Sequence, residues 1–101
     1  MQVKIVPHES NTPPGKLADA ELHFTDGPMH GLKLVGFAVW ERKNGNGRNV
    51  TFPARSYVVG GERRSFVLLR PAGEGPGPEA VRELILRAFD DHENAASGEQ
   101  G

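Results

Sequence analysis

The segment LKLVGFAVWERKNGNGRNVTFPAR, residues 32–55, holds two apolar stretches on either side of a turn that is rich in glycine and asparagine. Residues 32–41 are apolar on both faces and rich in Val, Phe and Trp, which is typical of a central strand or of a strand that meets a second chain. The NGNG turn at residues 44–47 accepts the positive φ angles of a tight hairpin. Residues 49–55 follow as its partner strand, which Pro53 restricts to an edge or a bulge. The segment therefore predicts a β-hairpin.

Shorter strand patterns lie on both sides of this hairpin. Residues 2–6 and residues 16–24 alternate polar and apolar side chains, the period of a strand with one buried face. Residues 64–70 predict another strand, after a turn at Gly60-Gly61. In the second of these strands the following residues share one face: Ala18, Ala20, Leu22 and Phe24.

The hydrophobic period changes near the C-terminus, where Pro78 suits the first position of a helix and Glu79 suits its positive end. One helical stripe is formed by these residues: Val81, Leu84, Ile85, Ala88, Phe89 and His92. Strands followed by one helix indicate an α+β fold, a small antiparallel β-sheet of about four to five strands with one C-terminal α-helix packed on it.

The length of 101 residues fits one domain, and 13 glycines and 8 prolines indicate a large share of loops. We expect an N-terminal strand and flexible arm at residues 1–15, a single domain at residues 16–94 and a disordered polar tail at residues 95–101. The longest apolar runs, such as residues 36–40, are far shorter than a membrane span, and residues 1–7 lack a signal-peptide core. These features predict a protein of the cytoplasm that does not contact a membrane.

Catalytic and metal-binding patterns are missing from the sequence. It contains no cysteine, which excludes disulfides and thiolate metal sites. No two of its four histidines have the three-to-five-residue spacing of a local zinc pair, and His92 fits a packed position at the edge of the helix better than a ligand. No serine lies in a nucleophile elbow, and no glycine-rich segment matches a phosphate-binding loop. We therefore expect no catalytic residue, metal or cofactor, and a protein that is not an enzyme.

Charge is segregated along the chain although the net charge is only −1. Residues 31–71 carry eight lysines and arginines against two glutamates, and residues 72–101 carry two arginines against seven acidic residues. A basic middle between acidic ends indicates a patch for an anionic partner, or simply a solvated sheet face balanced by an acidic helix.

A basic rim of the sheet is the candidate site, because arginine and lysine suit phosphate oxygens. Tyr57 or Trp40 could stack on an unpaired base, although Trp40 fits core packing better. The candidate nucleic-acid-binding residues are Lys33, Arg42, Lys43, Arg48, Arg55, Tyr57, Arg63 and Arg64.

Residues 17–89 resemble the bacterial septation-regulator family SpoVG (stage V sporulation protein G). The segment VTFPAR at residues 50–55 is similar to the family's "FV-x-MPSR/K" signature, with Phe52 in place of methionine and Ala54 in place of serine. The other parts of the resemblance come in the family's order: a first strand at residues 18–22, a second at residues 31–37, a strand ending in proline at residues 66–71 and a helix at residues 79–89.

The resemblance implies a small regulator that dimerises through strand exchange and binds DNA and RNA, largely with basic residues near the C-terminal helix and on the sheet rim. In this chain residues 90–93, DDHE, are acidic and should repel phosphate. Binding would therefore have to use the region from Arg42 to Arg70.

Two functions follow from these observations. The first is a non-enzymatic, homodimeric regulator that binds nucleic acid with a basic sheet rim. The second is a protein-interaction module, such as an inhibitor or accessory protein, whose rim meets an acidic protein surface.

Overall fold

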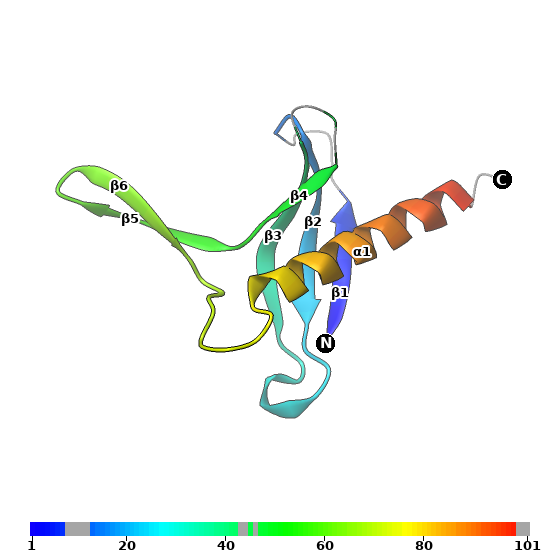
Figure 1. Cartoon of the computed structure of the whole chain (residues 1–101), viewed down its shortest axis with the longest axis horizontal. Coiled ribbons are helices and arrows are strands. Elements are labelled where there is room, and N and C mark those ends of the chain that lie inside the picture. Colours follow the sequence, from blue (N-terminus) through cyan, green and yellow to red (C-terminus); the bar gives the residue numbers. More distant parts are fainter. Residues whose placement is uncertain (8–12, 43–44, 46, 99–101) are drawn as a thin grey trace.

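The computed structural model describes residues 1–7, 13–42, 45 and 47–98, and Figure 1 shows the arrangement of their elements. The elements are β1 (Gln2–Pro7), β2 (Lys16–His23), a 3₁₀ turn η1 (Gly27–Met29), β3 (Lys33–Glu41), β4 (Arg48–Thr51), β5 (Ala54–Val59), β6 (Glu62–Val67) and α1 (Pro78–Gly98).

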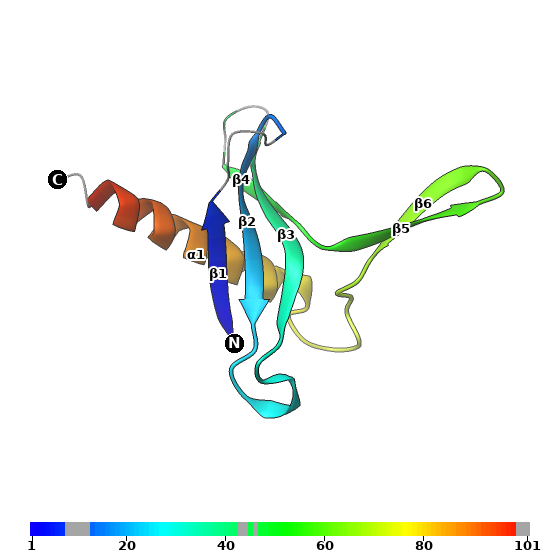
Figure 2. The same ribbon diagram turned by 180° about the vertical axis from the view of Figure 1, so that it is seen from behind.

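A four-stranded antiparallel sheet has the order β1-β2-β3-β4, so each strand pairs with its neighbour along the chain. The helix α1 lies across one face of this sheet, in front of the strands in Figure 1 and behind them in Figure 2. The α+β fold predicted from the sequence is confirmed. The strand expected at the N-terminus is β1, the outer strand beside β2.

The core lies between α1 and the sheet. Ala18, Ala20 and Leu22 of β2 are buried, which confirms the alternation predicted for this strand, whereas Phe24 lies beyond its end and is half-buried. The other buried apolar residues are Phe37, Ala38, Val39, Val50, Ile85 and Phe89. Phe37, Val39 and Ile85 are completely buried and belong to one apolar cluster that joins helix and sheet and leaves out Ala38.

The strand expected from residue 49 to residue 55 is interrupted at Pro53. Here β4 ends at Thr51, and the chain turns away from the sheet. Buried Pro53 packs against Gly36 of β3, whose φ is +108°. Proline has no N–H to donate to a ladder, so β4 cannot continue along β3.

Beyond Pro53, β5 and β6 pair only with each other and form a separate two-stranded sheet, here called the projecting hairpin (residues 54–67). It extends away from the four-stranded sheet in both views (Figures 1 and 2). The predicted Gly60-Gly61 turn closes it, with φ of 58° and 79°. The next strand was expected at residues 64–70, but β6 spans Glu62–Val67, because its pairing with β5 begins directly after that turn.

The helix α1 buries a narrower stripe than its sequence predicts. Ile85 and Phe89 are buried and Val81 and Ala88 are half-buried, but Leu84 and His92 are exposed. The prediction that His92 packs at the edge of the helix is therefore wrong, because a helix lying on a twisted sheet touches it along one line.

The polar tail expected at residues 95–101 is helical as far as Gly98, and the rest of it lies outside the described residues. Among the described residues, no helix has both the length and the apolar character needed to cross a membrane.

Candidate nucleic-acid interface

The register of the projecting hairpin sorts its side chains onto two faces, because residues directly opposite each other in an antiparallel pair share a face. Two contacts confirm the sorting on one face: the rings of Tyr57 and Phe66 lie 5.9 Å apart, and Arg64 Nη2 lies 3.4 Å from Glu62 Oε2. This face, here called the aromatic face, carries the opposed pairs Arg55/Phe66, Tyr57/Arg64 and Val59/Glu62.

The opposite side of the hairpin has a different character. Its residues are small or apolar apart from Arg63, and two serines lie opposite each other at its centre. This serine face carries the pairs Ala54/Val67, Ser56/Ser65 and Val58/Arg63. The register therefore places the two predicted binding residues Arg63 and Arg64 on opposite faces, as the alternation of adjacent strand residues requires.

Every residue of β5 and β6 is exposed. Tyr57 is 40% exposed and Phe66 41%, high values for aromatic side chains in a chain of this size. On the aromatic face each ring lies directly opposite an arginine, Tyr57 opposite Arg64 and Phe66 opposite Arg55. The face thus offers two guanidinium groups and two accessible π surfaces without a contact to the core.

Two of the other predicted binding residues are engaged within the fold. The Lys33 ammonium lies 3.4 Å from Glu21 Oε2 on the four-stranded sheet. Arg48 Nη2 donates a hydrogen bond of 2.7 Å to Glu93 Oε1 of α1, and its guanidinium lies 5.0 Å from the centre of the Phe89 ring. The acidic end of the helix therefore holds an arginine of β4 in place.

One further predicted residue, Arg42, directly follows β3. The backbone N–H of Arg42 donates to Gly47 O, and Lys43 lies outside the described residues. Of the eight candidates, the structure brings Arg55, Tyr57 and Arg64 together on one surface.

Trp40 lies on β3 rather than on the projecting hairpin. Its Nε1 donates a 2.8 Å hydrogen bond to Thr51 Oγ1 of β4, and Lys16 Nζ lies 6.0 Å from the ring centre. Sequence reasoning missed Phe66, which it assigned only to a strand. Counting back from the Gly60-Gly61 turn would have placed Phe66 opposite Arg55.

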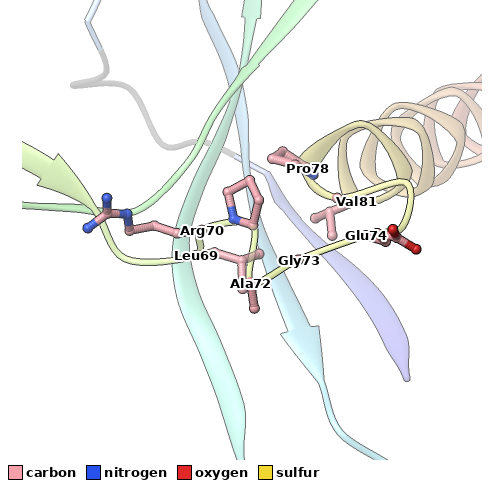
Figure 3. Close-up of a pocket in the computed structure, with 9 residues that line it drawn as sticks. Leu69, Arg70, Ala72, Gly73, Glu74, Pro78 and Val81 are labelled. Carbon is pink, nitrogen blue, oxygen red and sulfur yellow. The ribbon is translucent and has the colours of Figure 1, made fainter.

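A cavity of about 190 Å³ lies at the base of the projecting hairpin, between the loop after β6 and the start of α1 (Figure 3). Leu69, Ala72 and Val81 lie around it, and Arg70 points away from the helix in this view. Its lining lacks the cluster of titratable groups that acid–base chemistry needs. Within the part of the chain that the structure describes, no group of three or more potential ligands could hold a metal ion.

The face of the sheet opposite α1 contains one carboxylate with a shifted pKa. Glu21 Oε1 accepts a hydrogen bond of 2.9 Å from His23 Nε2, and this bond, helped by Lys33, holds the pKa of Glu21 below its ordinary value.

Because the folded state favours ionised Glu21, this group stabilises the protein above the pKa of an unfolded glutamate, about 4.3, and the stabilisation is lost as the pH falls through the lowered folded value. We expect urea unfolding to show wild type more stable than Glu21→Gln at pH 7 and the difference to be smaller at pH 3. A difference that is the same at both pH values would contradict this assignment.

No protein-family model matches the chain, and no curated protein or solved structure gives a significant match. The resemblance to the SpoVG family therefore stays a prediction.

Proposed function

We propose that this protein is a non-enzymatic regulator that binds nucleic acid with the aromatic face of its projecting hairpin. The observation that carries the proposal is the exposed ring pair Tyr57 and Phe66, each ring directly opposite an arginine. Guanidinium groups bind phosphate oxygens bidentately, and exposed rings stack on bases, so the two kinds of side chain together match the two parts of a nucleotide.

The location of the face supports the same function. The hairpin extends beyond the four-stranded sheet, so a long polymer can pass along it without meeting α1 (Figures 1 and 2). The five acidic side chains of α1 lie on another element, and Glu93 is already paired with Arg48. Of the basic rim that the sequence predicts, the proposal keeps only the two arginines of the aromatic face, Arg55 and Arg64. We also propose the cytoplasm as the location of the protein, as the sequence predicts.

The test is binding of labelled DNA and RNA oligonucleotides by fluorescence anisotropy over a series of salt concentrations. We expect the logarithm of the affinity to fall linearly with the logarithm of the salt concentration, and heparin to displace the oligonucleotide. Absence of binding at low salt would refute the proposal. A protein from the source cell that stays bound in the presence of heparin and nuclease would instead support the second function, recognition of an acidic protein surface.

The homodimer expected from the sequence remains a proposal, but the surface that supports it changes. The prediction rested on two apolar faces of residues 32–41, yet α1 covers one face, and the other face combines Trp40 with the charged side chains of Asp19, Glu21 and Lys33. Among the described large apolar side chains, Val58 of the hairpin is the most exposed, at 65%, and it lies on the serine face. Small residues there allow close approach of a second copy.

We expect light scattering to give the mass of a dimer at micromolar concentration. Replacing Val58 and Val67 together by glutamate should give a monomer, since it removes the apolar area of the contact between two serine faces and replaces it by carboxylates that lose water on burial. The matched control is Leu32→Glu, a similarly exposed apolar residue away from the hairpin, which should leave the mass unchanged. A monomer mass for the wild-type chain would contradict the homodimer.

We also propose that the chain is related to the SpoVG family. Two separate parts of the resemblance meet in the structure: Gly36, from residues 31–37, packs against Pro53, from the VTFPAR segment. This contact gives the motif a structural role, since it sets the point at which the projecting hairpin leaves the sheet.

A further inference from the structure

We infer that the aromatic face takes single-stranded rather than double-stranded nucleic acid, with bases stacked on Tyr57 and Phe66 and phosphates held by Arg55 and Arg64. The inference rests on the proposed function and specifies its substrate class. It predicts a preference for unpaired strands that depends on the two rings, whereas general electrostatic attraction depends on charge alone.

The spacing of the four side chains supports this assignment. They form two rows across the hairpin, Arg55 with Phe66 and Tyr57 with Arg64, and successive rows on one face of a strand lie about 7 Å apart. Each row contains one ring and one guanidinium, in opposite order. The two rings are therefore diagonal neighbours, with centres 5.9 Å apart and planes tilted by 58°. Two tilted rings offer separate stacking surfaces, one for each of two successive bases.

The accessibility of the rings is the second argument. In a duplex the faces of the bases are covered by their neighbours in the stack, so an exposed ring on a protein has no base face to contact unless the duplex opens. An unpaired strand offers base faces freely, and stacking on aromatic side chains is the usual way in which proteins bind it. The 40% exposure of Tyr57 and the 41% exposure of Phe66 leave both rings available.

A two-stranded ribbon can also enter the major groove of duplex DNA, and this alternative makes a different demand on the side chains. Proteins that recognise sequence in the major groove present hydrogen-bonding side chains to the edges of the bases. Near the middle of the aromatic face, where a groove would be read, half of the side chains are the rings of Tyr57 and Phe66. These rings would be placed against base edges and sugars. The composition of the face therefore favours the single strand.

Glu62 belongs to the same site because it lies on the aromatic face beside the turn. Its Oε2 lies 3.4 Å from Arg64 Nη2. A phosphate that binds Arg64 must compete with this carboxylate. We expect Glu62→Gln to raise the affinity for single strands a few-fold, since the variant removes both the competition and a repulsive charge.

The experiment compares one mixed-sequence 15-nucleotide DNA, free and annealed to its complement, by fluorescence anisotropy at constant salt. For the wild-type protein we expect the single strand to bind at least tenfold more tightly than the duplex. Tyr57→Leu and Phe66→Leu, which keep apolar bulk without a ring, should each weaken single-strand binding by about 5- to 150-fold and leave duplex binding unchanged. Tyr57→Phe should bind like wild type.

Leu68→Ala is the matched control, since it removes an exposed apolar side chain just outside the hairpin. It should change neither affinity, and circular dichroism should show that all variants are folded. Equal affinity for both forms, or ring variants that bind the single strand as wild type does, would overturn the inference and leave the proposed function standing. Failure to bind either form would refute the proposed function itself.

Discussion

Gly36→Ala is expected to destabilise the fold by about 2–6 kcal/mol, a large part of the stability of a typical small domain. Gly36 has φ +108°, a conformation that costs a residue with a Cβ about 1–3 kcal/mol. A Cβ at this position would lie 2.9 Å from Pro53 Cβ, and relieving such overpacking costs about another 1–3 kcal/mol. Urea unfolding monitored by the fluorescence of Trp40 measures the decrease in the free energy of unfolding.

Gly31→Ala separates the two causes. Gly31 also has positive φ, +90°, but a Cβ there has no atom within 4 Å, so the variant should show only the backbone contribution, about 1–3 kcal/mol. In a double-mutant cycle, Gly36→Ala with Pro53→Gly should lose less free energy of unfolding than the two single variants lose in sum, because removing the Pro53 Cβ relieves the contact. Equal effects of Gly31→Ala and Gly36→Ala would show that the contact with Pro53 contributes nothing.

Reversing both arginines of the aromatic face, with Arg55→Glu and Arg64→Glu together, is expected to weaken nucleic-acid binding by about 100-fold or more. Each hydrogen bond to a charged group contributes about 1.5–3 kcal/mol, and the new carboxylates add repulsion. The slope of log affinity against log salt should also fall by about one unit for each phosphate that an arginine no longer neutralises. Anisotropy titrations at several salt concentrations measure both effects.

The control changes the total charge equally at a distance from the hairpin. Lys4→Glu with Arg87→Glu alters two exposed cations, on β1 and α1, and should reduce the affinity only slightly. Neither double variant should change stability by more than about 1 kcal/mol, since exposed substitutions usually stay within about 0.5 kcal/mol each. If the control weakened binding as much as the hairpin variant did, binding would depend on net charge or on the helix rather than on the aromatic face.

Most elements of the fold were predictable from local patterns in the sequence. The exception is β5, since residues 49–55 were expected to form one strand and no strand was expected at residues 56–59. Alternation identified β2, the glycine pairs identified both hairpin turns, and the change of period identified α1. What local pattern could not supply was the partner of β5, because a strand of alternating residues looks the same whether it extends a sheet or leaves it. That choice depends on the packing of Gly36 against Pro53, and these two residues lie far apart in the sequence.

The candidate site was predicted only in part for the same reason. Basic residue types marked the right region, and Arg55, Tyr57 and Arg64 do lie together on the aromatic face. No local pattern indicated that Arg48 would reach Glu93, because an ion pair between residues 45 positions apart follows from packing of α1 on β4. Phe66 was missed because its face depends on the register of a hairpin whose second strand was placed two residues too late.

The separation of the hairpin from the helix gives the molecule an electric dipole. The hairpin carries three arginines and one glutamate, whereas α1 carries two arginines and five acidic residues, and the two elements point to opposite ends of a molecule 55 Å long (Figure 1). This length is several times the screening distance at physiological salt, about 8 Å, so a polyanion attracts the near end far more strongly than it repels the other. If nucleic acid is the partner, as we propose, the resulting torque would turn the hairpin toward the polymer and leave the acidic end of the helix facing the solution.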